Sequence, residues 1–231
     1  MSATTLAFPI ITVNPPPNVW VAAGPLNTLY PYGLTPGPVS IVSTSAADTA
    51  LGIGARTVLL VGSSTADGTV QFEIITLNGT TPVVSTLSYR FVLSQQTVQT
   101  VGSNGSPVGN IVYTLASTTV HKIRAGYNGD ISAAGTIASN LNAFFFNQTY
   151  WADKYTEFRF QIRNNSIPNA PFIDQDLITV YGDEDEHFTP FDKAPLRVHP
   201  LGDAQTLVRA KFPNTQIIIS ARGALVDNSA L

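Results

Sequence analysis

From Val39 onward the sequence is a succession of short β-rich stretches separated by turn residues, and this pattern restricts the chain to an all-β fold. The stretches are rich in Val, Ile, Thr, Tyr and Phe, and each is bounded by Gly, Asn, Asp or Ser. Asp67-Gly68 and Asn78-Gly79 are dipeptides that tolerate the positive φ angles of hairpin turns. Helical periodicity is limited to one short candidate, Ala133 to Asn142. Turn signals at about 8 to 12 residue intervals favour β-sandwich or jelly-roll-like modules over a βαβ fold.

Two stretches also indicate which strand faces are buried. Polar and apolar residues alternate strictly from Glu157 to Arg163, which predicts a strand with one buried and one wet face. Phe144 to Phe146 are apolar on both faces, which favours a central strand, with an interface strand as the alternative. The predicted strands are 39–44, 55–61, 69–77, 82–85, 87–101, 110–115, 120–125, 141–147, 156–163, 177–181, 196–199, 206–212 and 216–225.

Half of the sixteen prolines fall within the first 38 residues. Because proline fixes φ and lacks a backbone donor, this stretch cannot form an internal strand or a helix, and we expect an extended Pro-rich arm. Its apolar residues indicate that it packs either on its own domain or on a neighbouring subunit. We therefore expect an arm at 1–38, a first β-sandwich module at 39–118 and a second at 119–231. The candidate interface residues of the arm are Pro15, Pro16, Pro17, Trp20, Tyr30 and Tyr32.

Composition excludes several classes of function. Only 12% of the residues are charged, against about 25% in an average domain, and so weak a surface charge suits a chain that meets other chains. A monomer with a neutral surface is the alternative. The net charge of −3 and the scattered Lys and Arg residues argue against nucleic-acid binding. The chain has no cysteine, no recognisable signal peptide and no apolar run approaching the roughly 18 residues of a membrane helix.

The sequence offers no recognisable catalytic motif. It lacks a Gly-x-Ser-x-Gly elbow, a P-loop and a His-Glu-x-x-His pair, and it has three histidines in all, so we expect neither an enzyme nor a cofactor. The single dense polar cluster runs from Asp183 to His187. Asp183 and Asp185 could present oxygens to Ca²⁺ with Asp174 or Asp192, but the spacing is not that of an EF-hand. A solvated acidic loop, or a loop that meets a basic patch on a partner, is the favoured interpretation.

A set of turn and strand segments is distributed over most of the chain after the arm. They are Asp48 to Ala50, Gly54 to Val58, Thr76 to Val83, Gly102-Ser103, Gly109-Asn110, Pro195 to Val198 and Ala224 to Asn228. These segments resemble a family of virion structural proteins of tailed phages, of the cyanophage and marine phage type. The sequence departs from the family pattern at Ser63 to Asp67 and in the long arm.

The resemblance implies a β-sandwich protein built into the particle and transfers no catalytic or ligand residues. Its first implication is a capsid cement, or decoration, protein that binds the outside of the major capsid protein shell and stabilises the head. The expected partners are the major capsid protein and further copies of the chain, as a homotrimer or homodimer, with no nucleic acid and no membrane. The expected location is the capsid surface of the virion, after synthesis in the host cytoplasm. The alternatives are a tail, collar or fibre-base component, or a glycan-binding fibre module.

Overall fold

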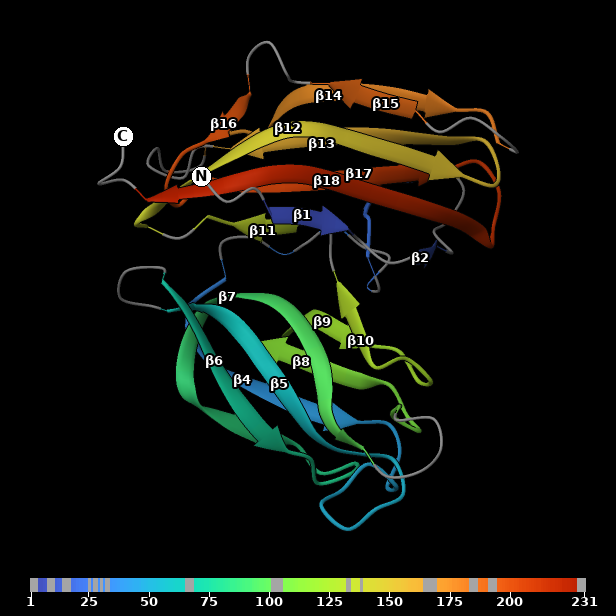
Figure 1. Ribbon diagram of the computed structural model, residues 1–231. Helices are drawn as coiled ribbons and strands as arrows, with labels where there is room; N and C mark the ends of the chain where they lie inside the picture. The colour runs from blue at the N-terminus through green and yellow to red at the C-terminus, as the bar shows by residue number, and fades with distance from the viewer. Residues whose placement is uncertain are drawn as a thin grey trace. The chain divides into compact units, whose positions relative to one another are not determined.

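The computed structural model has an all-β fold made of antiparallel sheets, as the sequence predicts (Figure 1). It describes residues 4–7, 11–13, 18–24, 26, 29, 31, 34–64, 69–100, 106–131, 134–137, 139–163, 170–182, 187–190 and 195–227, with the side chains of 4–7, 11–13, 93–100, 130–131, 136 and 227 excepted. The chain divides into unit 1, formed by Met1–Leu29 and Ala133–Leu231, and unit 2, formed by Tyr30–Ser132.

Unit 1 contains two sheets. The six-stranded sheet has the order β1-β18-β12-β15, with β2 also paired to β18 and β16 to β12. The five-stranded sheet has the order β11-β17-β13-β14, with β3 also paired to β17. The strands of the first sheet are β1 (Thr4–Ala7), β2 (Ile11–Val13), β12 (Leu141–Ala152), β15 (His187–Pro190), β16 (Leu196–Val198) and β18 (Thr215–Asp227). Those of the second are β3 (Val21–Ala22), β11 (Ala134–Thr136), β13 (Thr156–Arg163), β14 (Ile173–Val180) and β17 (Asp203–Ala210).

The main core of unit 1 lies between these two sheets. Tyr150 of β12 and Ile217 of β18 belong to the same buried cluster as Phe158 of β13 and Val208 of β17. The rings of Tyr150 and Phe158 lie 5.1 Å apart, which joins the two layers directly. Inward-facing residues from two packed sheets are the defining property of a β-sandwich.

Unit 2 contains one seven-stranded sheet with the order β6-β5-β7-β4-β8-β9, and β10 also pairs with β7. The long strand β7 pairs with β4 through its first part and with β5 and β10 through its second part. Its core includes Ile41, Leu60, Tyr89 and Tyr113, all fully buried. The strands are β4 (Gly37–Ser43), β5 (Ala55–Ser64), β6 (Val70–Thr76), β7 (Val83–Thr100), β8 (Ile111–Leu115), β9 (Thr118–Ile123) and β10 (Gly129–Ile131).

The unit boundaries differ from the expected modules 39–118 and 119–231. Strand β9 pairs with β8, and β10 pairs with β7, so the chain stays in the sheet of unit 2 beyond residue 118. The expected boundary at residue 38 also differs, because strands of the expected arm pair with the C-terminal part of the chain. Strand β1 pairs with β18 and β3 with β17, and unit 1 is therefore built from both ends of the chain.

Two local predictions need correction. The helical candidate Ala133 to Asn142 contains strand β11 and the start of β12, because pairing with β17 and β18 overrides its local helical preference. The two predicted strands 82–85 and 87–101 correspond to one strand, β7, which runs from Val83 to Thr100. The pairing of β7 with β4 is irregular between Val84 and Ser88, where the Ser85 hydroxyl accepts a hydrogen bond from the Val39 amide and donates one to the Leu87 carbonyl.

Strand β12 is a central strand, as the Phe144 to Phe146 run predicts. It pairs with β18 on one side and with β15 and β16 on the other. Its register with β18 shifts between Phe145 and Asn147, so Phe146 is an extra residue and interrupts the simple alternation of faces. Phe145 packs on Phe160 of the other sheet, with ring centroids 5.3 Å apart.

Candidate interaction surfaces

Trp20 is the predicted interface residue that the structure describes, and its side chain contacts unit 1 itself. The guanidinium carbons of Arg159 and Arg209 lie 4.4 and 4.9 Å from the Trp20 ring centroid. These cation–π contacts hold the chain next to β3 against the five-stranded sheet. Packing of the arm on its own domain is therefore observed at this position. The other predicted interface residues, Pro15, Pro16, Pro17, Tyr30 and Tyr32, lie outside the described residues.

The outward face of β13 carries the polar ladder that its alternating sequence predicts. Phe158 and Phe160 are buried, whereas Glu157, Arg159 and Arg163 are partly exposed. Arg209 Nε donates to the Glu157 carboxylate at 2.7 Å, and Arg163 Nε donates to buried Asp203 at 2.9 Å. Cross-strand pairs of opposite charge stabilise a sheet face, and they leave few of these cations available for a ligand.

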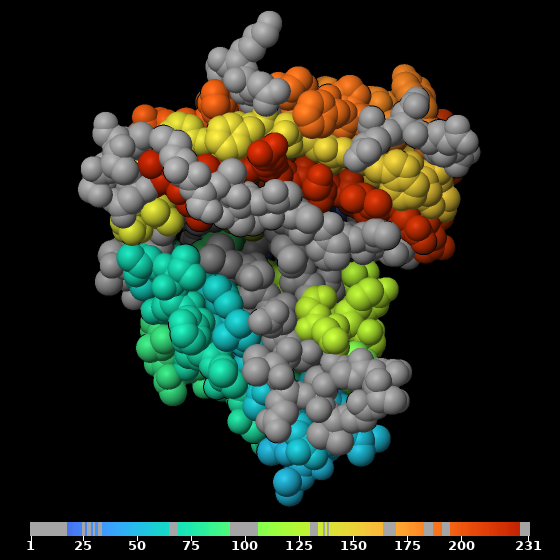
Figure 2. Space-filling view, viewed as in Figure 1, coloured from blue at the N-terminus to red at the C-terminus, as the bar shows by residue number. Residues whose placement is uncertain are grey.

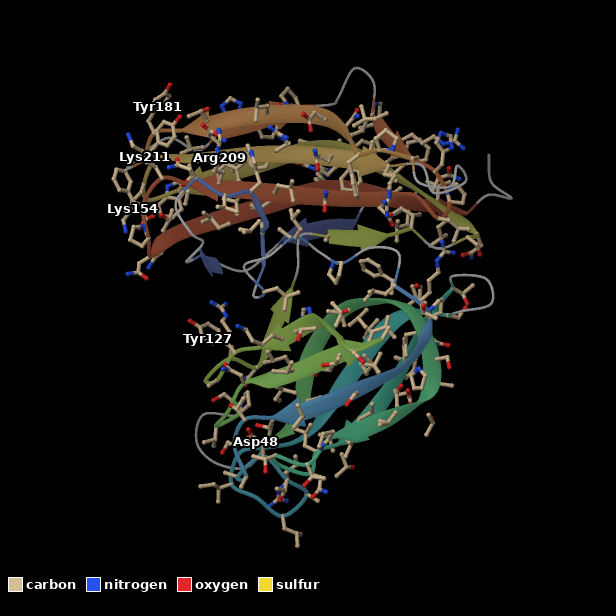
Figure 3. All side chains as sticks on the ribbon, turned by 180° about the vertical axis from the view of Figure 1, so that it is seen from behind. Asp48, Tyr127, Lys154, Tyr181, Arg209 and Lys211 are labelled. Atoms are coloured by element: carbon tan, nitrogen blue, oxygen red, sulfur yellow. The ribbon has the colours of Figure 1, made fainter. Side chains whose placement is uncertain are left out.

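Aromatic and cationic side chains gather at one end of this sheet, where Figure 3 labels Tyr181, Arg209 and Lys211. The rings of Tyr155 and Tyr181 meet edge to face with centroids 5.6 Å apart. Lys211 Nζ lies 5.6 Å from the Tyr155 ring and 5.7 Å from the Phe212 ring. The hydrogen bond that Tyr155 donates to Glu157 raises the pKa of its hydroxyl, so the group stays neutral. Tyr181 and Phe212 are exposed, so the cluster presents aromatic side chains to solvent beside the Lys211 cation.

The described residues contain no group of three or more His, Asp or Glu side chains that could hold a metal ion. Asp183 and Asp185, the predicted Ca²⁺ ligands, lie outside the residues that the structure describes, as does Asp192. Asp174 accepts a hydrogen bond from Gln161 at 2.7 Å and lies 3.7 Å from Arg159.

Asp48 is a buried carboxylate that joins two loops at one end of unit 2 (Figure 3). Oδ1 accepts hydrogen bonds from the backbone amides of Ala55 and Val108, at 2.8 and 2.9 Å. Oδ2 accepts hydrogen bonds from the Ser43 hydroxyl and the Gly109 amide, at 2.6 and 2.9 Å. One side chain thus binds segments that are about 60 residues apart in the sequence.

The glycines of these loops allow this close approach. A Cβ atom on Gly54 would lie 2.0 Å from Asp48 Oδ1, and one on Gly109 would lie 2.5 Å from the Ser45 backbone nitrogen. A Cβ on Gly52 would lie 1.9 Å from the Ala47 carbonyl oxygen. The loops therefore have one tightly packed arrangement around the carboxylate.

Three large apolar side chains project from the loops that Asp48 joins. Leu51 is 90% exposed, and Ile53 and Val108 are also exposed. We call these three residues the apolar tip. Because the backbone beneath them is fixed by buried hydrogen bonds, the tip holds its apolar side chains in water instead of folding them inward. Grouped exposed apolar residues of this kind indicate a surface for binding another protein.

The edge strand β6 carries a second exposed apolar row. Val70, Phe72 and Ile74 alternate with Gln71 and Glu73, which face the first part of β7. Glu73 accepts hydrogen bonds from the Thr86 amide and hydroxyl and from the Leu87 amide, at 2.9, 2.5 and 3.1 Å. Gln71 Nε2 donates to the Ser88 carbonyl at 2.7 Å. These bonds fix which face of β6 turns outward.

Glu73 gives a pH dependence that can be measured. Partial burial raises the pKa of its carboxyl, but the hydrogen bonds from Thr86, Leu87 and Tyr89 outweigh burial and leave the pKa below its ordinary value of 4.5. The ionised group thus stabilises the fold above pH 4.5, and this contribution is lost as the pH falls through the lowered pKa. We expect Glu73→Gln to reduce the free energy of unfolding at pH 7, with the difference from wild type closing in acid. Urea unfolding at several pH values measures it, and a gap independent of pH would contradict it.

The sequence gives no direct sign of the structural role of Asp48 or of the burial of His121. Strand β9 is the last strand in its sheet, but His121 is fully buried against Tyr113, with ring centroids 5.7 Å apart. The available signal for Asp48 was a lone acidic residue beside the glycine-rich run from Gly52 to Gly54. Such a run permits close backbone approach to a side chain.

No helix among the described residues is long and apolar enough to cross a membrane. Comparison with known proteins leaves the family open, since no protein-family model matches the chain and no curated protein matches it significantly.

Proposed function

We propose that the chain is a structural protein of a tailed-phage virion, and that it works as a capsid cement protein on the outside of the major capsid protein shell. The apolar tip of Leu51, Ile53 and Val108 is the observation that carries the proposal. The low charged fraction of 12% supports it, since copies that crowd on a shell repel each other weakly. The family resemblance of the turn segments around Asp48 and Gly109 points in the same direction.

The tip would act as a preformed anchor. Burying a Leu or Ile side chain contributes about 1.5–3 kcal/mol, and an anchor that is already rigid loses little conformational entropy on binding. The hydrogen bonds of Asp48 supply that rigidity. A stable attachment needs an interface of about 1,200 Å² or more, so the tip would be the centre of a larger contact, and many such contacts would sum over the shell.

The double substitution Leu51→Ser/Ile53→Ser tests this function. We expect it to weaken binding to shells assembled from the major capsid protein by at least about 100-fold, because two anchor side chains are lost. The matched control is Ile173→Ser/Leu177→Ser, which removes one exposed Ile and one exposed Leu from β14 of unit 1. Sedimentation of the protein with the shells measures binding. Equal binding by both double variants would reject the tip as the anchor.

Copy number separates the cement role from a tail, collar or fibre-base role. Quantitative mass analysis of purified virions, combined with a cryo-EM map, should find several hundred copies on the outer shell for a cement protein. A dozen copies or fewer at the tail vertex would reject the cement role and support a tail, collar or fibre-base component instead. Absence from the particle would reject the virion assignment.

A glycan-binding fibre module is the second candidate, and the aromatic cluster of Tyr155, Tyr181 and Phe212 favours it. Sugars stack on exposed aromatic faces, and Tyr181 is among the most exposed aromatic side chains of the described residues. A glycan array probed with the purified protein separates the candidates, because a cement protein has no need of glycan affinity.

A further inference from the structure

Among the residues that the structure describes, strand β6 combines an unpaired edge with an exposed apolar row. It is the terminal strand of the seven-stranded sheet and pairs with β5 on one side. In Figure 2 the turquoise residues of β6 lie on the visible surface of unit 2. Val70, Phe72 and Ile74 are exposed, and Phe72 is 69% exposed. An edge strand of this kind is a template for pairing with another strand.

The backbone register shows which residues of β6 offer hydrogen bonds at the open edge. The Leu77 amide donates to the Arg56 carbonyl, and the Ser64 amide donates to the Thr69 carbonyl. Antiparallel partners alternate between bonded and non-bonded pairs, so the odd-numbered residues between Thr69 and Leu77 bond to β5 in the observed register. Val70, Phe72 and Ile74 therefore direct their amides and carbonyls away from β5.

The edge lacks two of the features that usually prevent strand addition, because β6, with the sequence VQFEIIT, has neither proline nor lysine. Its one charged residue, Glu73, points inward, where hydrogen bonds from Thr86 and Leu87 hold its carboxylate within the unit. The strand thus presents apolar side chains and open backbone groups on the same three residues.

We propose that β6 pairs in antiparallel fashion with β6 of a second copy of this chain, about a twofold axis at Phe72. In this register Phe72 faces Phe72 of the other copy, and Val70 faces Ile74. The three facing pairs would form about six backbone hydrogen bonds. Gln71 faces Glu73, which places an amide donor beside a carboxylate. The pairing makes the two sheets continuous and gives a symmetric dimer.

The neighbouring registers are less complementary. The even-numbered residues of one copy must face the even-numbered residues of the other, because these carry the open backbone groups. An axis at Glu73 would set the two Glu73 carboxylates opposite each other, which is destabilising. An axis at Ile74 would set Val70 opposite Asn78, beyond the end of the strand. The axis at Phe72 pairs apolar residues throughout, and this self-complementarity identifies a second copy as the partner.

The inference goes beyond the proposed function, since pairing through β6 requires no capsid. Analytical ultracentrifugation of the purified chain tests it. We expect wild type at about twice its monomer mass of 24.6 kDa and Phe72→Lys as a monomer, because two lysines would meet at the axis. The control is Leu225→Lys, which changes a 57% exposed residue on β18, a strand paired on both sides. It should remain dimeric. A monomeric wild type, or a dimeric Phe72→Lys, would overturn the inference.

Single cysteines test the register, since the chain has no cysteine of its own. Residues of facing strands lie about 5.5 Å apart in a bonded pair, which a disulfide can span. Under mild oxidation Phe72→Cys should form a covalent dimer. Val70→Cys alone should not, but a mixture of Val70→Cys with Ile74→Cys should form the mixed dimer. Equal crosslinking by Val70→Cys and Phe72→Cys would reject this register. If β6 binds a different protein and not a second copy of this chain, none of the three cysteine variants should crosslink. That result would reject self-pairing.

Discussion

Replacing Asp48 with alanine should destabilise unit 2 by about 4 kcal/mol. The substitution removes one carboxylate and leaves the amides of Ala55, Val108 and Gly109 and the hydroxyl of Ser43 without their acceptor. A buried donor without a partner costs about 1–3 kcal/mol, and the loops can recover part of this by relaxing toward water. Asp48→Asn keeps one acceptor oxygen and should lose about half as much.

Urea unfolding followed by far-UV circular dichroism measures this loss. Tryptophan fluorescence does not report on it directly, because both tryptophans, Trp20 and Trp151, belong to unit 1. The control Ala50→Ser, at an exposed position in the same loop, should change stability by less than about 0.5 kcal/mol. If Asp48→Ala lay within that range too, the carboxylate would not be what joins the loops.

Phe158→Ala should destabilise unit 1 by a similar amount, about 4 kcal/mol. The Phe158 side chain is fully buried between the two sheets, where it contacts Tyr150 and shares a cluster with Val208 and Ile217. Truncation removes apolar contacts and leaves a cavity that two hydrogen-bonded sheets cannot close. Tryptophan fluorescence during urea unfolding measures the effect, because Trp151 lies on β12, next to Tyr150.

Phe212→Ala provides the matched control, since it makes the same change at a residue that is 46% exposed. It should cost less than about 1 kcal/mol. Comparable losses for the two variants would show that the packing between the sheets is not the main source of stability in unit 1.

The sequence predicts strands well where one local pattern determines them. The alternation from Glu157 to Arg163 gives the bounds of β13 and its buried face, because a half-buried strand needs period-two polarity whatever it packs on. The prolines of the first 38 residues are a weaker guide. Strands β1, β2 and β3 contain no proline, whereas Pro38 lies in β4, an internal strand between β7 and β8. The prediction that this segment forms no internal strand is therefore wrong at Gly37 and Pro38.

Properties that depend on distant partners could not be predicted in the same way. The division into units depends on β9 and β10 staying with the sheet of unit 2, which no composition change marks. Asp48 resembles a solvated loop residue until the chain brings Val108 and Gly109 to it. His121 lies in a charged run but faces the core beside Tyr113. For Asp48 a long-range contact decides the environment, and for His121 the pairing of β9 with β8 does; the residues next to them in the sequence do not show either outcome.

Construction of unit 1 from both chain ends sets an order of events on the ribosome. Strand β1 is synthesised before unit 2, and its partner β18 (Thr215–Asp227) is synthesised after it. At roughly 5–20 residues per second, β1 waits for tens of seconds, while the contiguous unit 2 has all of its strands and can fold. A nascent chain halted before Thr215 would therefore carry all the strands of unit 2. Its unit 1 would still lack β18, the strand that pairs with both β1 and β12.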